Sequence, residues 1–408
     1  MRFAAFAICG LLLPSTGKAD QSVLHLRIGD AARSDTEVPL VLDGITDTRV
    51  GELIEPRELA SRLADAGMLL IGENHTNTDF HRAQFQAIQA LHEAGREVLI
   101  GLEMFPYTQQ ASLDAWTDGL YTEDGFVELA KWYEYWGYDW SYYRDIFVYA
   151  RNNGIRMYGV NTPRDVVKTV RKKGFKELTP EEAAHVPTEV DVDDEDHRRL
   201  YRAFFEDDDA LHGVLDDAVF EGMFRAQCTW DATMGWNALQ ALKQHGGSDA
   251  IMVVLIGAGH VTYGLGVERQ TQPHFDGRIA SVIPVPVVDD AGAPVESVRA
   301  SYADFIWGVP EQLEPLRPVL GVSLMGKVGS EPTQIIRVDK KSVGERAGLR
   351  VGDVLVSLDD NTIGSAVHLR RAMSHYQWGD VPGLVIRRDG KTIELKVPLR
   401  RRSQVTDE

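Results

Sequence analysis

The sequence predicts an α/β protein in which a mainly parallel sheet is flanked by helices, followed by a small β-rich domain. Short aliphatic and β-branched runs alternate with helix-like stretches, which is typical of a parallel sheet covered by helices. The chain has 408 residues, which exceeds one average domain and leaves room for a second. A proline-rich stretch, residues 310–318, predicts a stiff linker between the two.

The first residues have the features of a secretory signal peptide. A positive start at Arg2 precedes a short apolar run, and the small residues Gly17 and Ala19 favour cleavage after Ala19. The run is too short to cross a bilayer. Since Cys9 lies inside the leader 1–19, Cys228 is the one cysteine expected in the mature chain, without an intramolecular disulfide. We expect a bacterial protein, periplasmic or secreted, that meets membranes only through a partner.

Charge is unevenly distributed along the chain. The formal net charge is −18, yet from Leu316 onward 16 Lys and Arg outnumber 11 Asp and Glu. The larger domain, 20–309, is therefore strongly acidic, which argues against nucleic acid as a partner.

The larger domain contains five predicted strands. Two helices are expected at Thr78–Ala94 and Asp145–Asn153, each followed by glycine. The interval Thr162–Asp249 has no convincing strand, so we expect a helical subdomain there, with the acidic segment Asp191–Asp196 as a loop. The strands are expected at Met68–Ile71, Val98–Leu102, Ile155–Val160, Ile251–Ile256 and Ile279–Val285.

Four of these strands run directly into polar residues. Ligands of parallel sheets bind beyond the carboxyl ends of the strands, so these residues are expected to meet in one cleft although they are far apart in sequence. Each one alone has an ordinary explanation as a loop, capping or ion-pair residue. The strand-end residues are Glu73, His75, Glu103, Asn161, Arg164 and His260.

The residue types allow two kinds of chemistry. Glu73, His75, Glu103 and His260 could hold a divalent metal with an open position for water, or act as acid and base around a polarised carbonyl. Asp231 is expected on a helix, either as a buried, paired carboxylate or as a partner of this site. No serine-hydrolase elbow, zinc-protease helix or phosphate-binding loop is present in the sequence.

Five short motifs in order resemble the ChaN family of haem-binding uptake proteins. The resemblance covers roughly Leu53 to Trp307, and it extends to a superfamily that includes TIKI proteases and erythromycin esterases. It implies iron or haem acquisition in the nearer family and hydrolysis in the wider one. The motifs are Gly72-Glu73-Asn74-His75, Leu102-Glu103-Met104-Phe105, Gly159 to Arg164, Arg225-Ala226-Gln227 with Asp231 and Met234, and Gly257 to Val261.

Haem requires an apolar slot, cations for its propionates and an axial ligand. The resemblance implies tyrosine ligation, and a dense aromatic stretch, 132–143, contains the candidates Tyr138, Trp140 and Tyr143, followed by Arg144. The stretch could equally be core or a lid over the sheet. Arg144 and Arg164 could meet propionates or pair with acidic residues.

The C-terminal segment 319–400 resembles a bacterial PDZ domain, with 401–408 as a tail. The resemblance rests on Leu320-Gly321-Val322, the stretch from Ala347 to Leu355 and a helix at Ser365–Ser374. It implies binding of protein C-termini, with the carboxylate on the Leu320–Val322 loop and the peptide as an added strand. Leu320, Val322, Leu369 and Met373 would line the groove, although some of them could be core residues.

Three functions of different classes follow from the sequence. A periplasmic haem or iron binder with haem as its cofactor ranks first because the nearer family match favours it. A peptidase- or esterase-like hydrolase, metal-dependent or acid–base, to which the PDZ domain brings substrates, ranks second. A scaffold that acts only through PDZ contacts ranks third.

Overall fold

The computed structural model describes residues 21–206, 217–289, 292–325 and 333–401. The expected signal peptide lies outside these residues, as does the tail after Arg401. The described chain forms two compact units. One comprises residues up to Ala130 together with Tyr143–Gln312, and the other comprises Lys131–Tyr142 together with the residues from Leu313 onward. The division after Gln312 falls inside the stretch expected to be a linker.

An eight-stranded sheet forms the centre of the larger unit. Its order is β3-β2-β10-β8-β4-β7-β5-β6, and the six strands from β10 to β6 are parallel. The mainly parallel sheet predicted from the sequence is therefore confirmed. The parallel strands are β4 (Ala66–Glu73), β5 (Glu97–Pro106), β6 (Met157–Asn161), β7 (Ala250–Gly257), β8 (Arg278–Pro286) and β10 (Phe305–Val309).

One edge of this sheet was not predicted. There, β2 (Ile45–Asp47) and β3 (Glu52–Ile54) form an antiparallel hairpin, and β2 pairs with β10. Both strands have three residues, too few to show a period. Two further short strands, β1 (Glu37–Pro39) and β9 (Ser297–Arg299), form a separate ladder.

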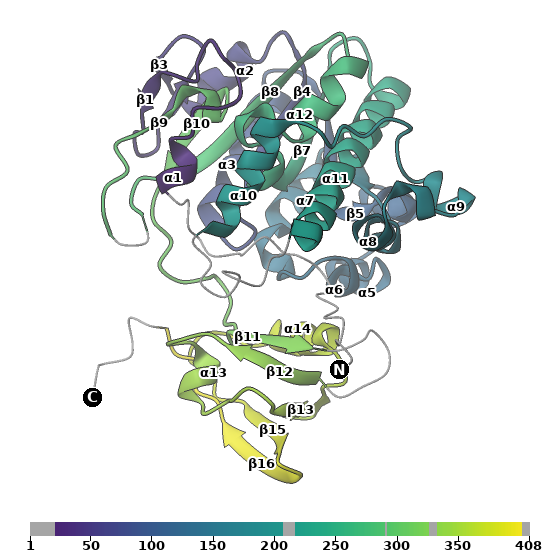
Figure 1. Ribbon diagram of the computed structural model, residues 1–408, viewed down its shortest axis with the longest axis vertical. Helices are drawn as coiled ribbons and strands as arrows, with labels where there is room; N and C mark the ends of the chain where they lie inside the picture. Colours follow the sequence, from purple (N-terminus) through teal and green to yellow (C-terminus); the bar gives the residue numbers. More distant parts are fainter. Residues whose placement is uncertain (1–20, 207–216, 290–291, 326–332, 402–408) are drawn as a thin grey trace. The chain divides into compact units, whose positions relative to one another are not determined.

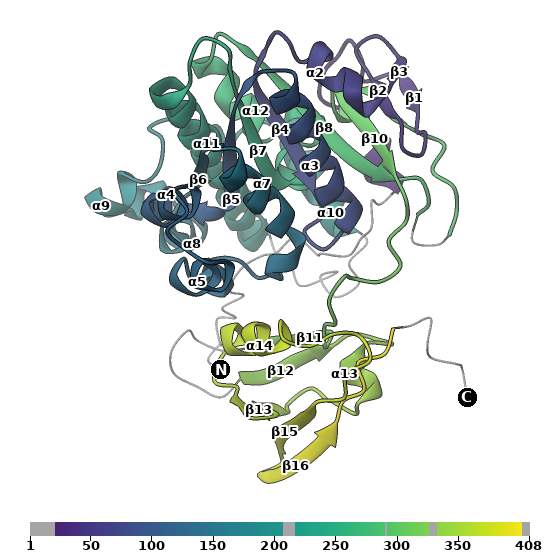
Figure 2. The ribbon, with the colours of Figure 1, turned by 180° about the vertical axis from the view of Figure 1, so that it is seen from behind.

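Helices cover both faces of the sheet. The long helix α11 (Asp217–His245) and the short α12 (Val267–Thr271) cover the face seen in Figure 1, whereas α3 (Thr78–Glu93) and α7 (Arg144–Asn152) cover the face seen in Figure 2. Asn77 caps α3 by accepting from the backbone N–H groups of Asp79 and Phe80. Because both faces are covered, all eight residues of β7 are buried.

The interval after β6 is helical in the part that the structure describes, as expected. It contains α8 (Arg164–Lys173), α9 (Pro180–Ala183), α10 (Glu195–Glu206) and α11. Residues 191–194 of the acidic segment form a loop, and its last two residues begin α10. Asp194 accepts from the backbone N–H of His197. Among the described residues, no helix is both long and apolar enough to cross a membrane.

The second unit contains an antiparallel sheet of order β11-β12-β13-β15-β16 with a helix, α14 (Ala366–Met373). Its strands include β11 (Val322–Met325), β12 (Thr333–Val338), β13 (Val354–Leu358), β15 (Gly383–Arg388) and β16 (Lys391–Lys396). Asp353 is buried before β13, where Arg388 binds it through two nitrogens at 2.6 and 2.7 Å. The buried charge is thus paired and hydrogen-bonded, which fixes the turn before β13.

Candidate functional site

Four of the predicted strand-end residues come from three adjacent strands. In the sheet, β7 lies between β4 and β5, so Glu73 at the end of β4, Glu103 near the end of β5 and His260 just after β7 share one edge. His75 follows β4 by two residues. The structure brings these four side chains together; with the residues that hold them, we call them the site cluster.

Glu73 has both carboxylate oxygens occupied. Its Oε1 accepts from the hydroxyl of Tyr143 at 2.6 Å and lies 2.7 Å from Nδ1 of His75. Its Oε2 accepts from the amide of Gln84 at 2.7 Å and lies 3.4 Å from Nδ1 of His81. Glu73 is only 3% exposed, so these bonds replace the water that burial removes.

His81 and Gln84 are site residues that the sequence reasoning missed. Both lie on the buried face of α3, and the ring nitrogens of His81 face two acceptors, the Gln84 Oε1 at 3.1 Å and the carbonyl oxygen of His75 at 3.2 Å. A clue was available, because positions 81 and 84 belong to the same helical stripe as Ile88 and Leu91. Buried polar side chains are normally hydrogen-bonded, so polar residues on the buried stripe of a helix indicate hydrogen-bond partners inside the protein.

His260 is held by a second carboxylate. Its Nδ1 lies 2.5 Å from Oδ1 of Asp231, which is fully buried on α11. The side-chain amide of Gln227, one turn earlier on the same helix, lies 2.9 Å from the same nitrogen. The sequence left two roles open for Asp231, a buried paired carboxylate or a partner of this site. In the structure Asp231 has both roles.

Glu103 lies between the two histidines. Its Oε2 accepts from the backbone N–H of Gly257 at 2.7 Å, and its Oε1 lies 3.7 Å from Nε2 of His260. A carbon atom placed at the Cβ position of Gly257 would lie 3.4 Å from Nε2 of His75 and 3.6 Å from Oε2 of Glu103. The absence of a side chain at Gly257 thus leaves a small space beside both groups.

The environment shifts the pKa values of the cluster in opposite directions. Burial would raise the pKa of Glu73, but the charge of His81 and the bonds from His75 and Tyr143 lower it to about 2. Burial would lower the pKa values of His75 and His260, but the adjacent carboxylates raise both. The positive charge of His260 partly opposes protonation of His75. The two imidazoles are therefore coupled.

Asn161 ends β6, and Arg164 begins the helix that follows. The Asn161 side chain donates to the backbone carbonyl of Glu103 at 2.9 Å, so it supports the strand end that carries Glu103. Arg164 is the first residue of α8, and its side chain is exposed.

The aromatic candidates for a haem wall are arranged differently from the expectation. Tyr143 is completely buried and donates to Glu73, so it belongs to the site cluster. Arg144 binds Glu123 through two nitrogens at 2.6 and 2.7 Å. Tyr138 and Trp140 are buried in the segment Lys131–Tyr142, which belongs to the other unit. In this structure, Tyr143 and Arg144 are therefore engaged with protein carboxylates.

The sequence also allowed a divalent metal site at four of these residues. Within the described residues, no group of three or more His, Cys, Asp or Glu side chains is arranged to hold a metal ion, including the set His75, His260, Glu73 and Glu103. Cys228 is buried inside α11, and burial raises the pKa of its thiol.

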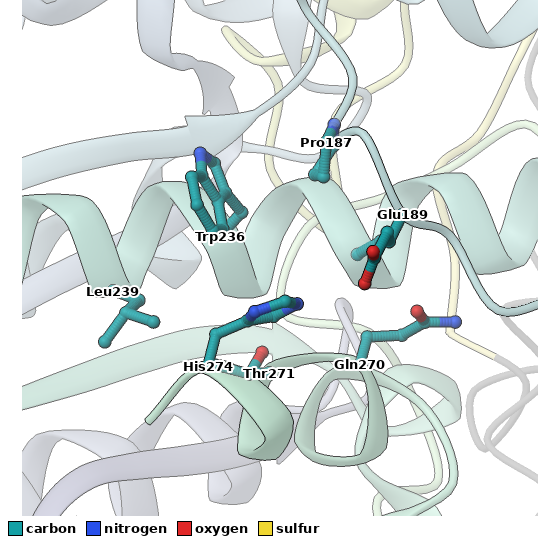
Figure 3. A pocket seen from close by; sticks show the side chains of 8 residues that line it. Pro187, Glu189, Trp236, Leu239, Gln270, Thr271 and His274 are labelled. Carbon is teal, nitrogen blue, oxygen red and sulfur yellow. The ribbon is translucent and has the colours of Figure 1, made fainter. Parts of the chain in front are cut away.

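A separate small pocket lies beside α11 (Figure 3). Trp236 and Leu239 line it from α11, and Gln270 and Thr271 line it from α12. His274 completes this side of the pocket. No member of the site cluster lines it, so it is a different location from the strand-end residues.

The candidate groove residues of the second unit lie around β11 and α14. Gly321 has a positive φ of 67°, which glycine adopts without strain, and this conformation shapes the loop before β11. Leu320, Leu369 and Met373 are buried in the core of the unit, while Val322 is half-buried. Three of the four proposed lining residues thus contribute to the core.

Comparisons with known proteins match two parts of the chain to two different domain families. The model of the family described as haem-binding uptake, Tiki superfamily, ChaN matches residues 59–270, and the PDZ domain model matches residues 318–399. The chloroplastic protein RETICULATA-RELATED 5 of Arabidopsis thaliana is 27% identical over 190 residues. That match covers 42% of this chain but only 23% of the Arabidopsis protein.

Solved structures that this chain matches include ChaN of Campylobacter jejuni, described with cofacially bound haem, and an erythromycin esterase in its open conformation. The first is 16% identical with a TM-score of 0.49, and covers 64% of this chain and 95% of its own. The second is 13% identical with a TM-score of 0.38, and covers 68% and 98%. Since the family match spans more than half of the chain, this protein belongs to the ChaN-type haem-binding uptake family of the Tiki superfamily, and it carries a PDZ domain at residues 318–399.

Proposed function

We propose that the larger unit is a hydrolase that cleaves an ester or amide bond by acid–base catalysis. One observation carries the proposal: two histidines are each held at Nδ1 by a buried carboxylate, at 2.7 Å for His75 and 2.5 Å for His260, with Glu103 between them. A carboxylate at Nδ1 fixes the ring and leaves Nε2 for proton transfer. Haem ranked first from sequence alone, but this arrangement favours proton transfer.

The roles follow from the charges around each ring. His260 contacts both Asp231 and Glu103, and its charge opposes protonation of His75, so we assign His260 as the acid and His75 as the base. His75 takes a proton from water as its oxygen bonds to the acyl carbon. The bond to the leaving oxygen or nitrogen then breaks, and His260 gives that atom its proton. The products are a carboxylic acid and an alcohol or amine.

Turnover of chromogenic esters and of fluorogenic peptides by the mature protein tests this proposal. His260→Ala is expected to abolish turnover, because it removes the side chain assigned as the acid. His92→Ala is the matched control, because His92 bonds the Tyr149 hydroxyl near the end of α3 farthest from the strand-end residues. Turnover that survives His260→Ala would contradict the assignment.

The PDZ domain supports protein C-termini as the recruited partners. In the described part of the second unit, β11 is the outer strand of its sheet, so an extended peptide could add to it. A free carboxylate would gain charge-assisted bonds from backbone N–H groups of the Leu320–Val322 loop. Amidation should therefore weaken binding of a good peptide ligand, measured by calorimetry. Equal affinity of the free and amidated peptides would contradict carboxylate recognition.

Export to a periplasm, expected from the leader, forms part of this proposal.

Haem binding is a second candidate function, and a tyrosine–histidine pair at the surface favours it. Tyr107 directly follows β5, is 36% exposed, and has its hydroxyl 2.7 Å from Nδ1 of His185. Tyrosine can ligate haem iron, and a histidine nitrogen is well placed to accept the phenol proton. Thr162 donates to the His185 carbonyl at 3.2 Å, and the exposed Arg164, two residues later, offers a cation for a propionate.

A haem titration followed by the Soret band tests this candidate. Tyr107→Phe should remove or shift the band, whereas Tyr149→Phe should not, although it also removes a tyrosine–histidine bond. Wild-type protein without a saturable Soret change would exclude haem binding. An unchanged band in Tyr107→Phe would instead place the ligand elsewhere.

A further inference from the structure

One oxygen of Asp231 is not accounted for by the cluster described so far. Asp231 is fully buried and its Oδ1 holds His260, but its Oδ2 has no hydrogen-bond partner among the described residues. A buried carboxylate oxygen without a partner is costly. The ring of His197, from α10, lies beside it, with Nε2 at 3.6 Å from Oδ2.

The tautomer of His197 follows from its other nitrogen. Nδ1 lies 3.3 Å from Nη2 of Arg269, and a guanidinium can only donate, so Nδ1 must accept. A neutral ring then has its proton on Nε2, which faces Asp231. Burial, together with the charge of Arg269, lowers the pKa of His197, in agreement with a neutral ring.

Neighbouring side chains bury the ring of His197. Its side chain is 1% exposed, and the ring of Phe224 packs edge-on at 5.0 Å. Arg269 is itself held by the side chain and the carbonyl of Asp191, and Gln270 donates to the same carbonyl at 2.6 Å. The titratable and charged groups that face His197 are Asp231, Cys228, Arg269, Asp194 and His260.

We propose that His197 is a positioning residue that donates from Nε2 to Oδ2 of Asp231 and so fixes the carboxylate that holds His260. The distance of 3.6 Å exceeds a hydrogen bond, so a small approach of the two groups completes it. Arg269 sets the tautomer, and the acidic loop at Asp191 holds Arg269. The acidic segment, whose excess charge had no assigned role, thus helps to order the site. This inference deepens the proposed acid–base function and rests on it.

Proton NMR of the intact mature protein with nitrogen-labelled histidine tests the assignment. A proton shared between His260 and Asp231 at 2.5 Å should resonate at low field, and Asp231→Asn, which removes the charged acceptor, identifies it by loss of the resonance. In His197→Ala the resonance should be lost or move upfield. His92→Ala should leave it unchanged.

Two further variants keep the test independent of folding. In His197→Gln the amide nitrogen can reach the position of Nε2, whereas in His197→Asn it reaches that of Nδ1. The resonance should therefore persist in the glutamine variant and be lost in the asparagine variant. An unchanged resonance in His197→Ala or His197→Asn, or none in the wild type, would overturn the proposal. The spectrum needs no substrate, so failure to find turnover would refute the proposed hydrolase and leave this assignment standing.

Discussion

The two carboxylate–histidine pairs of the site cluster differ in origin and in how completely each carboxylate is bonded. Glu73 and His75 are two residues apart, and Glu73 has partners at both oxygens. Asp231 and His260 are 29 residues apart on different elements, and Oδ2 of Asp231 has no hydrogen-bond partner in the described structure. The first pair is locally encoded and saturated, whereas the second depends on the fold.

This difference indicates different roles for the two carboxylates. Gln84, Tyr143 and two histidines hold Glu73 rigidly, so its contribution to the stability of the folded state should be large. Asp231 is less constrained, and it adjoins the histidine that we assign as the acid. Its contribution should therefore appear mainly in turnover.

Replacing Asp231 by asparagine should have the largest effect. The amide keeps the shape of the carboxylate but removes the charge that holds the His260 tautomer. We expect kcat to fall by about 10³-fold, measured with the same ester or peptide probe as the wild type. A loss of less than a few-fold would mean that the Asp231 pair is not the catalytic one.

Replacing Glu73 by glutamine should chiefly lower stability, in a pH-dependent manner. The pKa of Glu73 is about 2 in the folded protein, below its ordinary value of 4.5, so its contribution is complete above pH 4.5 and is lost as the pH falls towards 2. The shift corresponds to roughly 3 kcal/mol. Denaturant unfolding of both proteins at pH 6 and pH 3 should show a difference that shrinks at the lower pH. A constant difference would contradict the role of ionised Glu73.

Removing the Tyr143 hydroxyl should have a smaller effect. Tyr143→Phe deletes one bond to an ionised carboxylate, which typically contributes about 2 kcal/mol. Tyr149→Phe deletes a bond to the imidazole of the half-buried His92 and not to a carboxylate, so it should cost less. Thermal unfolding of the two variants side by side measures the difference. Equal destabilisation would indicate that the Tyr143 bond has no special strength.

Sequence patterns predicted five of the six buried parallel strands, because continuous apolar runs such as β7 have a clear length and end. The sixth, β10, was not predicted. The patterns also placed Glu73, His75, Glu103 and His260 at one sheet edge, since parallel strands share their carboxyl ends. The short strands β2 and β3 were missed because three residues carry no periodic pattern. Their position is set by pairing with β10, which is distant in sequence.

The residues that support the site were harder to predict than the residues at its centre. His197 lies on a helix, and only the packing of α10 against α11 brings it to Asp231. For Arg144 the sequence left open a propionate or an acidic partner, and Glu123, 21 residues earlier, binds it. Such pairings arise from the tertiary fold and leave no local pattern.

Because Gly257 has no side chain, the residue at this position determines how much room is left beside His75 and Glu103. Its φ of −56° is one that alanine adopts readily, so a methyl group could be added without backbone strain. That methyl would lie 3.2 Å from Cε1 of His75 and 3.6 Å from Oε2 of Glu103, so it would crowd both side chains. Gly257→Ala would therefore obstruct the reaction sterically, without removing any acidic or basic group of the site.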